Sequence, residues 1–218
     1  MSKEFDTAAL LDALDEIGEC AAAHHTRLEF NVYGGAALML AGNFRYSTED
    51  VDIAPLTDEW PVWLSDKVGA IAKERNWSES WLNDAVSFHL SKHATNRDHV
   101  LLGTFPRNSR SENAQVGLIV NVPSAEYMLA MKLKAMRIND PAKAATETHD
   151  ILSLLSVCRV TTVDKAIDIL AKFFPISAQA SEKQRFVLKH IMAKEQRNRK
   201  NAPTYPARRI RADDDRGR

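Results

Sequence analysis

The sequence has little cysteine, no excess of charge of either sign and no long apolar run. Its two cysteines, Cys20 and Cys158, lie far apart, which excludes a paired zinc motif and a disulfide framework. Basic and acidic residues number 29 each, so the chain has no overall attraction to nucleic acid or membranes. No segment stays apolar for the roughly 20 residues that a transmembrane helix needs. Acidic residues also interrupt the N-terminal apolar positions, which is untypical of a signal peptide. We expect a soluble, cytoplasmic protein with no membrane partner.

The first 122 of the 218 residues mix helical and strand patterns. Apolar residues recur at helical spacing or alternate, and each change of pattern falls at a glycine, proline or polar cluster. The predicted helices cover 7–24, 36–42 and 57–76, and the predicted strands cover 28–33, 50–54, 86–90, 100–105 and 116–122. This part is the expected α/β core.

From Pro123 onward only helical patterns follow, at 124–138, 145–158, 162–174 and 181–195. The sequence therefore predicts an α+β fold: a mixed sheet with flanking helices in residues 1–122, followed by a C-terminal helical region in 123–196 that packs on the core. Residues 197–218 are rich in arginine, lysine and proline without apolar periodicity, which predicts a disordered basic tail. Its positive charge is suited to an RNA backbone, and a solubilising tail is the alternative.

Two carboxylates stand out in the stretch STEDVDIAP. Asp50 and Asp52 are two residues apart on a predicted strand, so their side chains project from the same face. Such a pair repels unless a cation joins it, and Mg²⁺ (or Mn²⁺) is typically held by a few carboxylates together with substrate phosphates. A solvated acidic pair at a strand edge is the alternative interpretation.

A glycine pair precedes these carboxylates at a strand-to-helix turn. Gly34 and Gly35 lack a β-carbon, which lets backbone N–H groups approach a triphosphate at a helix start. Arg45 is placed to neutralise phosphate charge or to anchor the loop. A plain structural turn is the alternative, but the ordered combination with two aspartates favours nucleotide binding.

A lysine lies on the apolar stripe of the first C-terminal helix. Met128, Lys132 and Met136 follow helical spacing, whereas Lys134 falls on the opposite, solvent side. Lys132 either reaches toward water along its stem or pairs with nucleotide phosphate.

These motifs resemble the nucleotidyltransferase superfamily, in particular the branch of abortive-infection toxins of the AbiEii type and their bacterial relatives. The matching segments are GGAALMLAGNFRYSTEDVDI, WLNDAV, VPSAEYMLAMKLKAMR and the later HDI, within residues 28–157. The resemblance implies the following site residues: Gly34, Gly35, Arg45 and Thr48 for nucleotide, Asp50 and Asp52 for metal, and Lys132 with the later Asp150. It further implies an NTP substrate, a hydroxyl acceptor such as a tRNA 3′ end, and a cognate antitoxin.

The sequence departs from that superfamily in three places. Gly34-Gly35 stands where many members have a glycine-serine pair. Many members also carry a third carboxylate on a neighbouring strand, but the strand QVGLIVNV has none. Asp84 either substitutes for that carboxylate or is a turn residue. The link to Asp150 is long, so this residue is either the later aspartate that the resemblance implies or only the N-terminal acid of the next helix, where the helix dipole favours it. A catalytically silent nucleotide-binding relative and a plain interaction module therefore remain alternatives to the enzyme.

Other polar and aromatic residues are weaker candidates. His89, His93 and His99 cluster in the sequence, but zinc binding by the first two requires a helix where a strand is predicted. Tyr33 and Trp81 are aromatic candidates for stacking on a nucleobase, and buried packing is the alternative for both.

Overall fold

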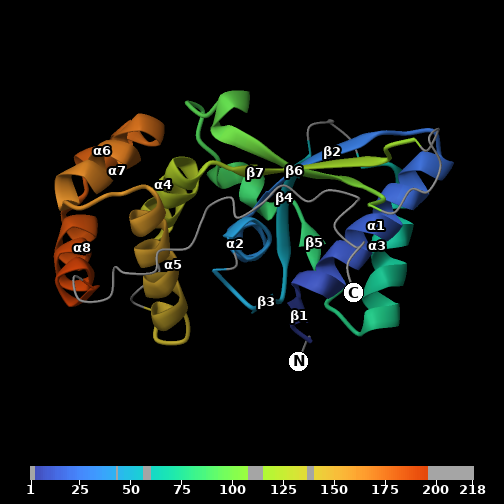
Figure 1. Ribbon diagram of the computed structural model, residues 1–218, viewed down its shortest axis with the longest axis horizontal. Coiled ribbons are helices and arrows are strands. Elements are labelled where there is room, and N and C mark those ends of the chain that lie inside the picture. The colour runs from blue at the N-terminus through green and yellow to red at the C-terminus, as the bar shows by residue number, and fades with distance from the viewer. Residues whose placement is uncertain (1–2, 43, 56–59, 108–114, 137–139, 196–218) are drawn as a thin grey trace, which may run out of the picture. The chain divides into compact units, whose positions relative to one another are not determined.

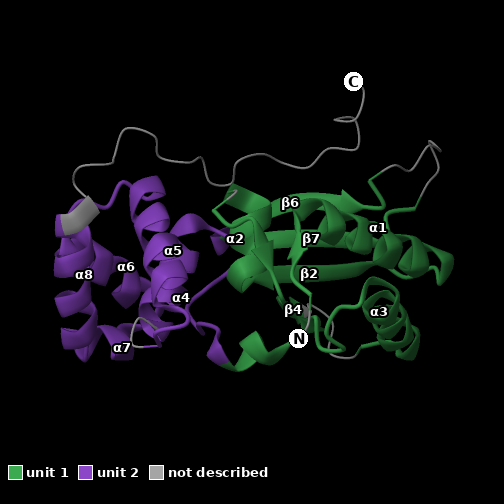
Figure 2. Ribbon diagram, turned by 90° about the horizontal axis from the view of Figure 1, so that it is seen from below, with its two compact units in different colours: residues 1–88, 99–122, 208–218 green, residues 89–98, 123–207 purple. Residues whose placement is uncertain are grey.

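The protein is described by a computed structural model over residues 3–42, 44–55, 60–107, 115–136 and 140–195 (Figure 1). These residues divide into two compact units (Figure 2). Of the described residues, unit 1 takes in those up to 88 together with those in 99–122, and unit 2 takes in those in 89–98 and 123–195.

Unit 1 contains a five-stranded mixed sheet. Its strand order is β5 (Leu82–Asn83), β4 (Val51–Pro55), β2 (Leu28–Tyr33), β7 (Leu118–Pro123) and β6 (His99–Phe105). The central strand β2 runs antiparallel to β4 and parallel to β7, and β4 runs parallel to β5. This arrangement, with helices beside the sheet and a separate helical unit, confirms the predicted α+β class.

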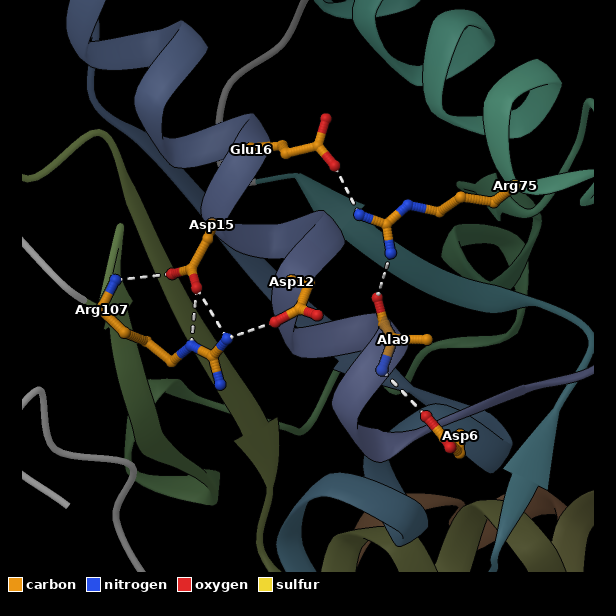
Figure 3. Close-up of polar contacts among 7 residues, drawn as sticks. All are labelled: Asp6, Ala9, Asp12, Asp15, Glu16, Arg75 and Arg107. Atoms are coloured by element: carbon orange, nitrogen blue, oxygen red, sulfur yellow. Dashed lines mark hydrogen bonds and ion pairs between the residues drawn. The ribbon is translucent and has the colours of Figure 1, made fainter. Parts of the chain in front are cut away.

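Three helices flank this sheet. They are α1 (Thr7–Ala23), α2 (Gly34–Gly42) and α3 (Val62–Arg75), and α1 packs against both α3 and β6 (Figure 1). The apolar stripe predicted for α1 is buried at Leu10, Leu14 and Ile17. The polar side of α1 is joined to its neighbours through charge pairs: Glu16 contacts Arg75 of α3, and Asp15 contacts Arg107 (Figure 3).

A second, two-stranded sheet was not predicted. β1 (Phe5–Asp6) pairs antiparallel with β3 (Ser47–Thr48), so that Phe5 lies opposite Thr48. Two residues are too few to show strand periodicity in a sequence, and the partner segments are far apart along the chain.

Unit 2 is helical. Its helices are α4 (Ala125–Ala135), α5 (Ala144–Val157), α6 (Val163–Phe173), α7 (Pro175–Gln179) and α8 (Glu182–Glu195). Tyr127 of α4 stacks on Phe173 of α6, with 4.8 Å between ring centroids. The Tyr127 hydroxyl also accepts the Ser91 N–H at 3.0 Å, which attaches the 89–98 segment to this unit.

Some predicted boundaries and one element type were wrong. The strand predicted at 86–90 is the short 3-10 helix η1 (Ala85–His89), because the Asn83 side chain accepts the Ala85 N–H at 3.1 Å and starts a turn directly after β5. The helix predicted from residue 57 begins at Val62 within the described residues, after Pro61. The basic tail at 197–218 lies outside the described residues. Within the described parts of the chain, no helix is long and apolar enough to cross a membrane.

Candidate functional site

The chain turns sharply from strand β2 into helix α2 at Gly34. Its φ of +64° lies in the left-handed region, which a residue with a β-carbon enters only at a cost of roughly 1–2 kcal/mol. The turn lets α2 begin directly after Tyr33, and Gly34 and Gly35 form its first turn. Backbone N–H groups in a first helical turn have no partner within the helix, and the helix dipole favours an anion there.

Asp52 lies directly beside this turn. It occupies β4 opposite Tyr33 of β2, and on its other side it is paired with Asn83 of β5. A β-carbon on Gly34 would come within 2.5 Å of Asp52 Oδ2, so the carboxylate is packed against the glycine backbone. The predicted metal ligand and the predicted phosphate turn are therefore neighbours.

Arg45 and Thr48 meet at the second glycine. A β-carbon on Gly35 would lie 2.7 Å from Arg45 Nη1 and 2.9 Å from Thr48 Oγ1. Arg45 is half-buried, so its guanidinium group is held close to the first turn of α2. The structure thus brings together five of the residues that the sequence singled out: Gly34, Gly35, Arg45, Thr48 and Asp52.

Asp50 is placed by Thr48. The Thr48 hydroxyl lies 3.1 Å from the Asp50 carbonyl oxygen and 3.4 Å from Asp50 Oδ1. Thr48 is buried, whereas Asp50 is exposed. The prediction that Asp50 belongs to the strand was wrong, since β4 begins at Val51 and Asp50 lies in the segment that joins β3 to β4.

The donor set of this site suits a magnesium ion bound together with a phosphorylated substrate. Mg²⁺ in such sites takes one or two protein carboxylates and completes its shell with water and phosphate oxygens. Asp50 and Asp52 supply that number, and the absence of a β-carbon on Gly34 lets the Asp52 carboxylate lie close to the first turn of α2. Among the described residues no group of three or more His, Cys, Asp or Glu side chains gathers to bind a metal.

No protein-family model matches this chain, and no curated protein matches it in sequence. Among solved structures, it is similar to an antigenic nucleotidyltransferase-like protein from Paracoccidioides brasiliensis. The two share 15% sequence identity over 88% of this chain and 95% of that chain, with a TM-score of 0.48. Roles for individual residues follow from the geometry of this chain alone.

Lys132 and Asp150 meet in unit 2. Lys132 on α4 is buried, and its ammonium group lies 2.7 Å from Asp150 Oδ2 and 3.0 Å from Glu147 Oε1, both on α5. Asp150 is fully buried in the middle of α5, so the alternative of an N-terminal helix acid was wrong. The alternative that Lys132 reaches water was also wrong, because its side chain is buried and its ammonium group forms ion pairs with the two carboxylates.

Lys134 remains partly exposed, unlike Lys132. Its ammonium group donates to the His89 carbonyl oxygen at 2.9 Å and lies 4.4 Å from the centroid of the Phe174 ring. This lysine therefore also contacts other residues of unit 2.

The remaining candidates divide by burial. Tyr33 is 1% exposed, with its hydroxyl 2.9 Å from His99 Nε2, and Trp81 is fully buried, with its indole donating to the Val68 carbonyl. Neither ring offers an open face to a nucleobase. Asp84 is exposed at the start of η1, where its carbonyl accepts the Ser87 N–H.

One aromatic residue beside the site was missed. Tyr46 follows Arg45 directly and is 94% exposed, in contrast to the burial usual for tyrosine. The sequence signal that could have identified Tyr46 as a candidate was its position directly after Arg45 of the proposed nucleotide motif. An exposed ring in this loop is suited to stacking on a base.

Proposed function

We propose that this protein is a metal-dependent nucleotidyltransferase, which moves a nucleoside monophosphate from an NTP to a hydroxyl acceptor. The observation that carries the proposal is the packing of the Asp52 carboxylate against Gly34. It joins the phosphate-binding turn to a metal carboxylate, which is what an enzyme acting on a magnesium nucleotide needs.

Each residue of the cluster has a distinct part in this proposal. Gly35 and the first turn of α2 bind the triphosphate through backbone N–H groups, and Arg45 adds a fixed positive charge beside them. Asp50 and Asp52 hold Mg²⁺, which when bound supplies positive charge to the reacting phosphate oxygens. Thr48 orients Asp50, and Tyr46 stacks on the nucleobase or on a base of the acceptor.

The reaction is a substitution at the α-phosphorus. The acceptor hydroxyl oxygen forms the new bond to phosphorus, pyrophosphate leaves, and the hydroxyl proton passes to solvent or to a nearby base. The acceptor that the family resemblance suggests is a tRNA 3′ end, in a toxin that has a cognate antitoxin. A protein hydroxyl or a small molecule is the other class of acceptor.

We assign Lys132 a different role from the nucleotide-binding one that the resemblance implied. Because it is buried and paired with Glu147 and Asp150, we assign it to the stability of unit 2. A lysine held between two carboxylates has little charge left for phosphate.

A second candidate function is nucleotide binding without turnover. Strand β7 carries Asn121 as its polar residue, and this side chain donates to Glu29 Oε1 at 2.9 Å. This neutral amide stands on the strand where catalytic members of the superfamily often have a third metal-binding carboxylate, and it cannot supply that negative charge.

The test is incubation of the full chain with each α-labelled NTP, Mg²⁺ and total bacterial RNA. We expect label in RNA or protein with the wild type, and none with Asp50→Asn or Asp52→Asn. Asp66→Asn, the same change at an exposed position on α3, is the matched control and keeps activity. Nucleotide binding without any transferred label establishes the second candidate instead.

A further inference from the structure

The loop that carries Asp50 is attached to the N-terminal segment of the chain. Strand β3 precedes this loop, and its only pairing in the described sheets is with β1. Beyond the backbone register, the Ser47 hydroxyl donates to Glu4 Oε2 at 2.5 Å. A two-stranded ribbon is marginally stable alone, so β3 depends on whatever fixes β1.

Phe5 fixes β1 in the core of unit 1. Its side chain is 3% exposed, and its ring centroid lies 4.2 Å from that of Trp77 and 6.1 Å, edge to face, from that of Trp81. Burial of a phenylalanine side chain removes a large apolar surface from water and so stabilises this attachment. This aromatic cluster is the apolar anchor of the ribbon.

Polar contacts secure the other side of the same strand. The Asp6 carboxylate accepts the Ala9 N–H at 2.9 Å and so caps α1, and Arg75 donates to the Ala9 carbonyl at 3.1 Å (Figure 3). The Arg75 guanidinium also lies 5.3 Å from the centroid of the Trp77 ring. Strand β1 is therefore immobilised through both its residues.

We propose that Phe5 is a positioning residue for the metal-binding loop. Phe5 holds β1, and β1 holds Thr48 through the β3 pairing. The Thr48 hydroxyl, which lies beside Gly35, in turn holds Asp50. This inference rests on the proposed function, since it assigns a cation to Asp50. Its new content is that an aromatic anchor in the first strand sets the affinity for that cation.

The physical basis is the order of the loop before the cation binds. A carboxylate that is already fixed loses little conformational freedom when it binds a metal, whereas a mobile loop must be ordered at that moment. Release of β1 should therefore weaken cation binding through Asp50, even though Phe5 is not itself a ligand.

The test compares the full chain with Phe5→Ala, Phe5→Leu and Leu102→Ala. Leu102 is buried on β6, at the opposite edge of the sheet from β5, so Leu102→Ala is the control for general loss of stability. The measurements are thermal unfolding, amide hydrogen exchange of the peptide covering residues 44–55, and binding of Mn²⁺ alone followed by electron paramagnetic resonance.

For Phe5→Ala we expect roughly tenfold faster exchange in that peptide and roughly tenfold weaker Mn²⁺ binding. Phe5→Leu should recover most of both, and Leu102→Ala should lower the unfolding temperature while leaving both unchanged. The inference is overturned if Phe5→Ala loses stability as the control does but keeps loop protection and Mn²⁺ affinity. If the wild type does not bind Mn²⁺, the proposed function and the assignment of a cation to Asp50 are both overturned. Hydrogen exchange would still show separately whether Phe5 orders the loop.

Discussion

Asp52 Oδ2 lies 2.5 Å from the point where a β-carbon on Gly34 would stand. A residue of the proposed phosphate-binding turn and a residue of the proposed metal pair thus share one contact, and neither side chain can be enlarged alone. Substitutions at the glycine therefore report on the carboxylate.

Gly34→Ala should lower stability and abolish cation binding together. The new β-carbon meets the Asp52 carboxylate, and the φ of +64° adds strain of roughly 1–2 kcal/mol. Gly69→Ala is the matched control, because a β-carbon there meets nothing within 4 Å and the position lies inside helix α3. The control should gain up to about 1 kcal/mol. Urea unfolding and Mn²⁺ titration measure both effects, and an unchanged Mn²⁺ affinity in Gly34→Ala would contradict the site.

Lys132→Met should destabilise unit 2 by about 3–5 kcal/mol, because it leaves two buried carboxylates without their cation. Changing Glu147→Gln and Asp150→Asn in the same chain should restore most of that loss. Lys165→Met, an exposed lysine of α6, should stay within about 0.5 kcal/mol of the wild type. Urea unfolding measures the free energy of unfolding of each variant. A Lys132→Met protein with normal stability but lower nucleotide affinity would show that Lys132 binds phosphate instead.

Tyr46→Ala should raise the KM for the nucleotide or weaken acceptor binding by roughly tenfold, since stacking on a base contributes about 1–3 kcal/mol. Tyr46→Phe keeps the ring and should behave as the wild type. Phe186→Ala, another exposed aromatic position, lies in unit 2 and is the control. Steady-state kinetics of the labelled transfer give the KM for the nucleotide and the KM for the acceptor. Stacking by Tyr46 would be excluded if both values in Tyr46→Ala equalled those of Tyr46→Phe and Phe186→Ala.

Glu16 should make unit 1 sensitive to acid. Burial acts to raise the pKa of Glu16, but hydrogen bonds from Lys67 and Arg75 outweigh it and hold the pKa below its usual 4.5. A lowered pKa in the folded state gives stability that is present above pH 4.5 and is lost as the pH falls through the folded value.

The wild type should therefore lose thermal stability more steeply than Glu16→Gln once the pH drops below 4.5. Glu19→Gln changes an exposed acid on the same helix and should follow the wild type. Unfolding temperatures measured across this acid range give the result. Parallel curves for wild type and Glu16→Gln would show that the pair with Lys67 and Arg75 does not stabilise the fold.

The sequence was most informative where a pattern repeated over several residues. Strand 28–33, the helix after the glycine pair and four helices of unit 2 were predicted because apolar spacing persists over several residues in each. The cluster around Gly34, Arg45 and Asp52 was predictable because its members lie within one short stretch, so that local order along the chain implied nearness in space.

Other features depended on contacts between distant segments. The ion pairs of Lys132 join two helices across a connecting segment, and apolar periodicity places the lysine on a buried stripe without naming its partner. Strands β1 and β3 have two residues each, and their pairing becomes visible only when the fold brings the N-terminal segment to the loop before Asp50. Burial of Trp81 likewise follows from the aromatic cluster around Phe5, which no local pattern indicates.

The pairing of Tyr33 with Asp52 has one more consequence. Because the two strands are paired residue by residue, their register sets the distance between the proposed phosphate-binding turn and the proposed metal ligand Asp52. A slip of one residue would turn Asp52 to the opposite face of the sheet and remove it from Gly34 altogether. If the proposed function holds, the β2–β4 register therefore determines which spacing between phosphate and metal a substrate must have.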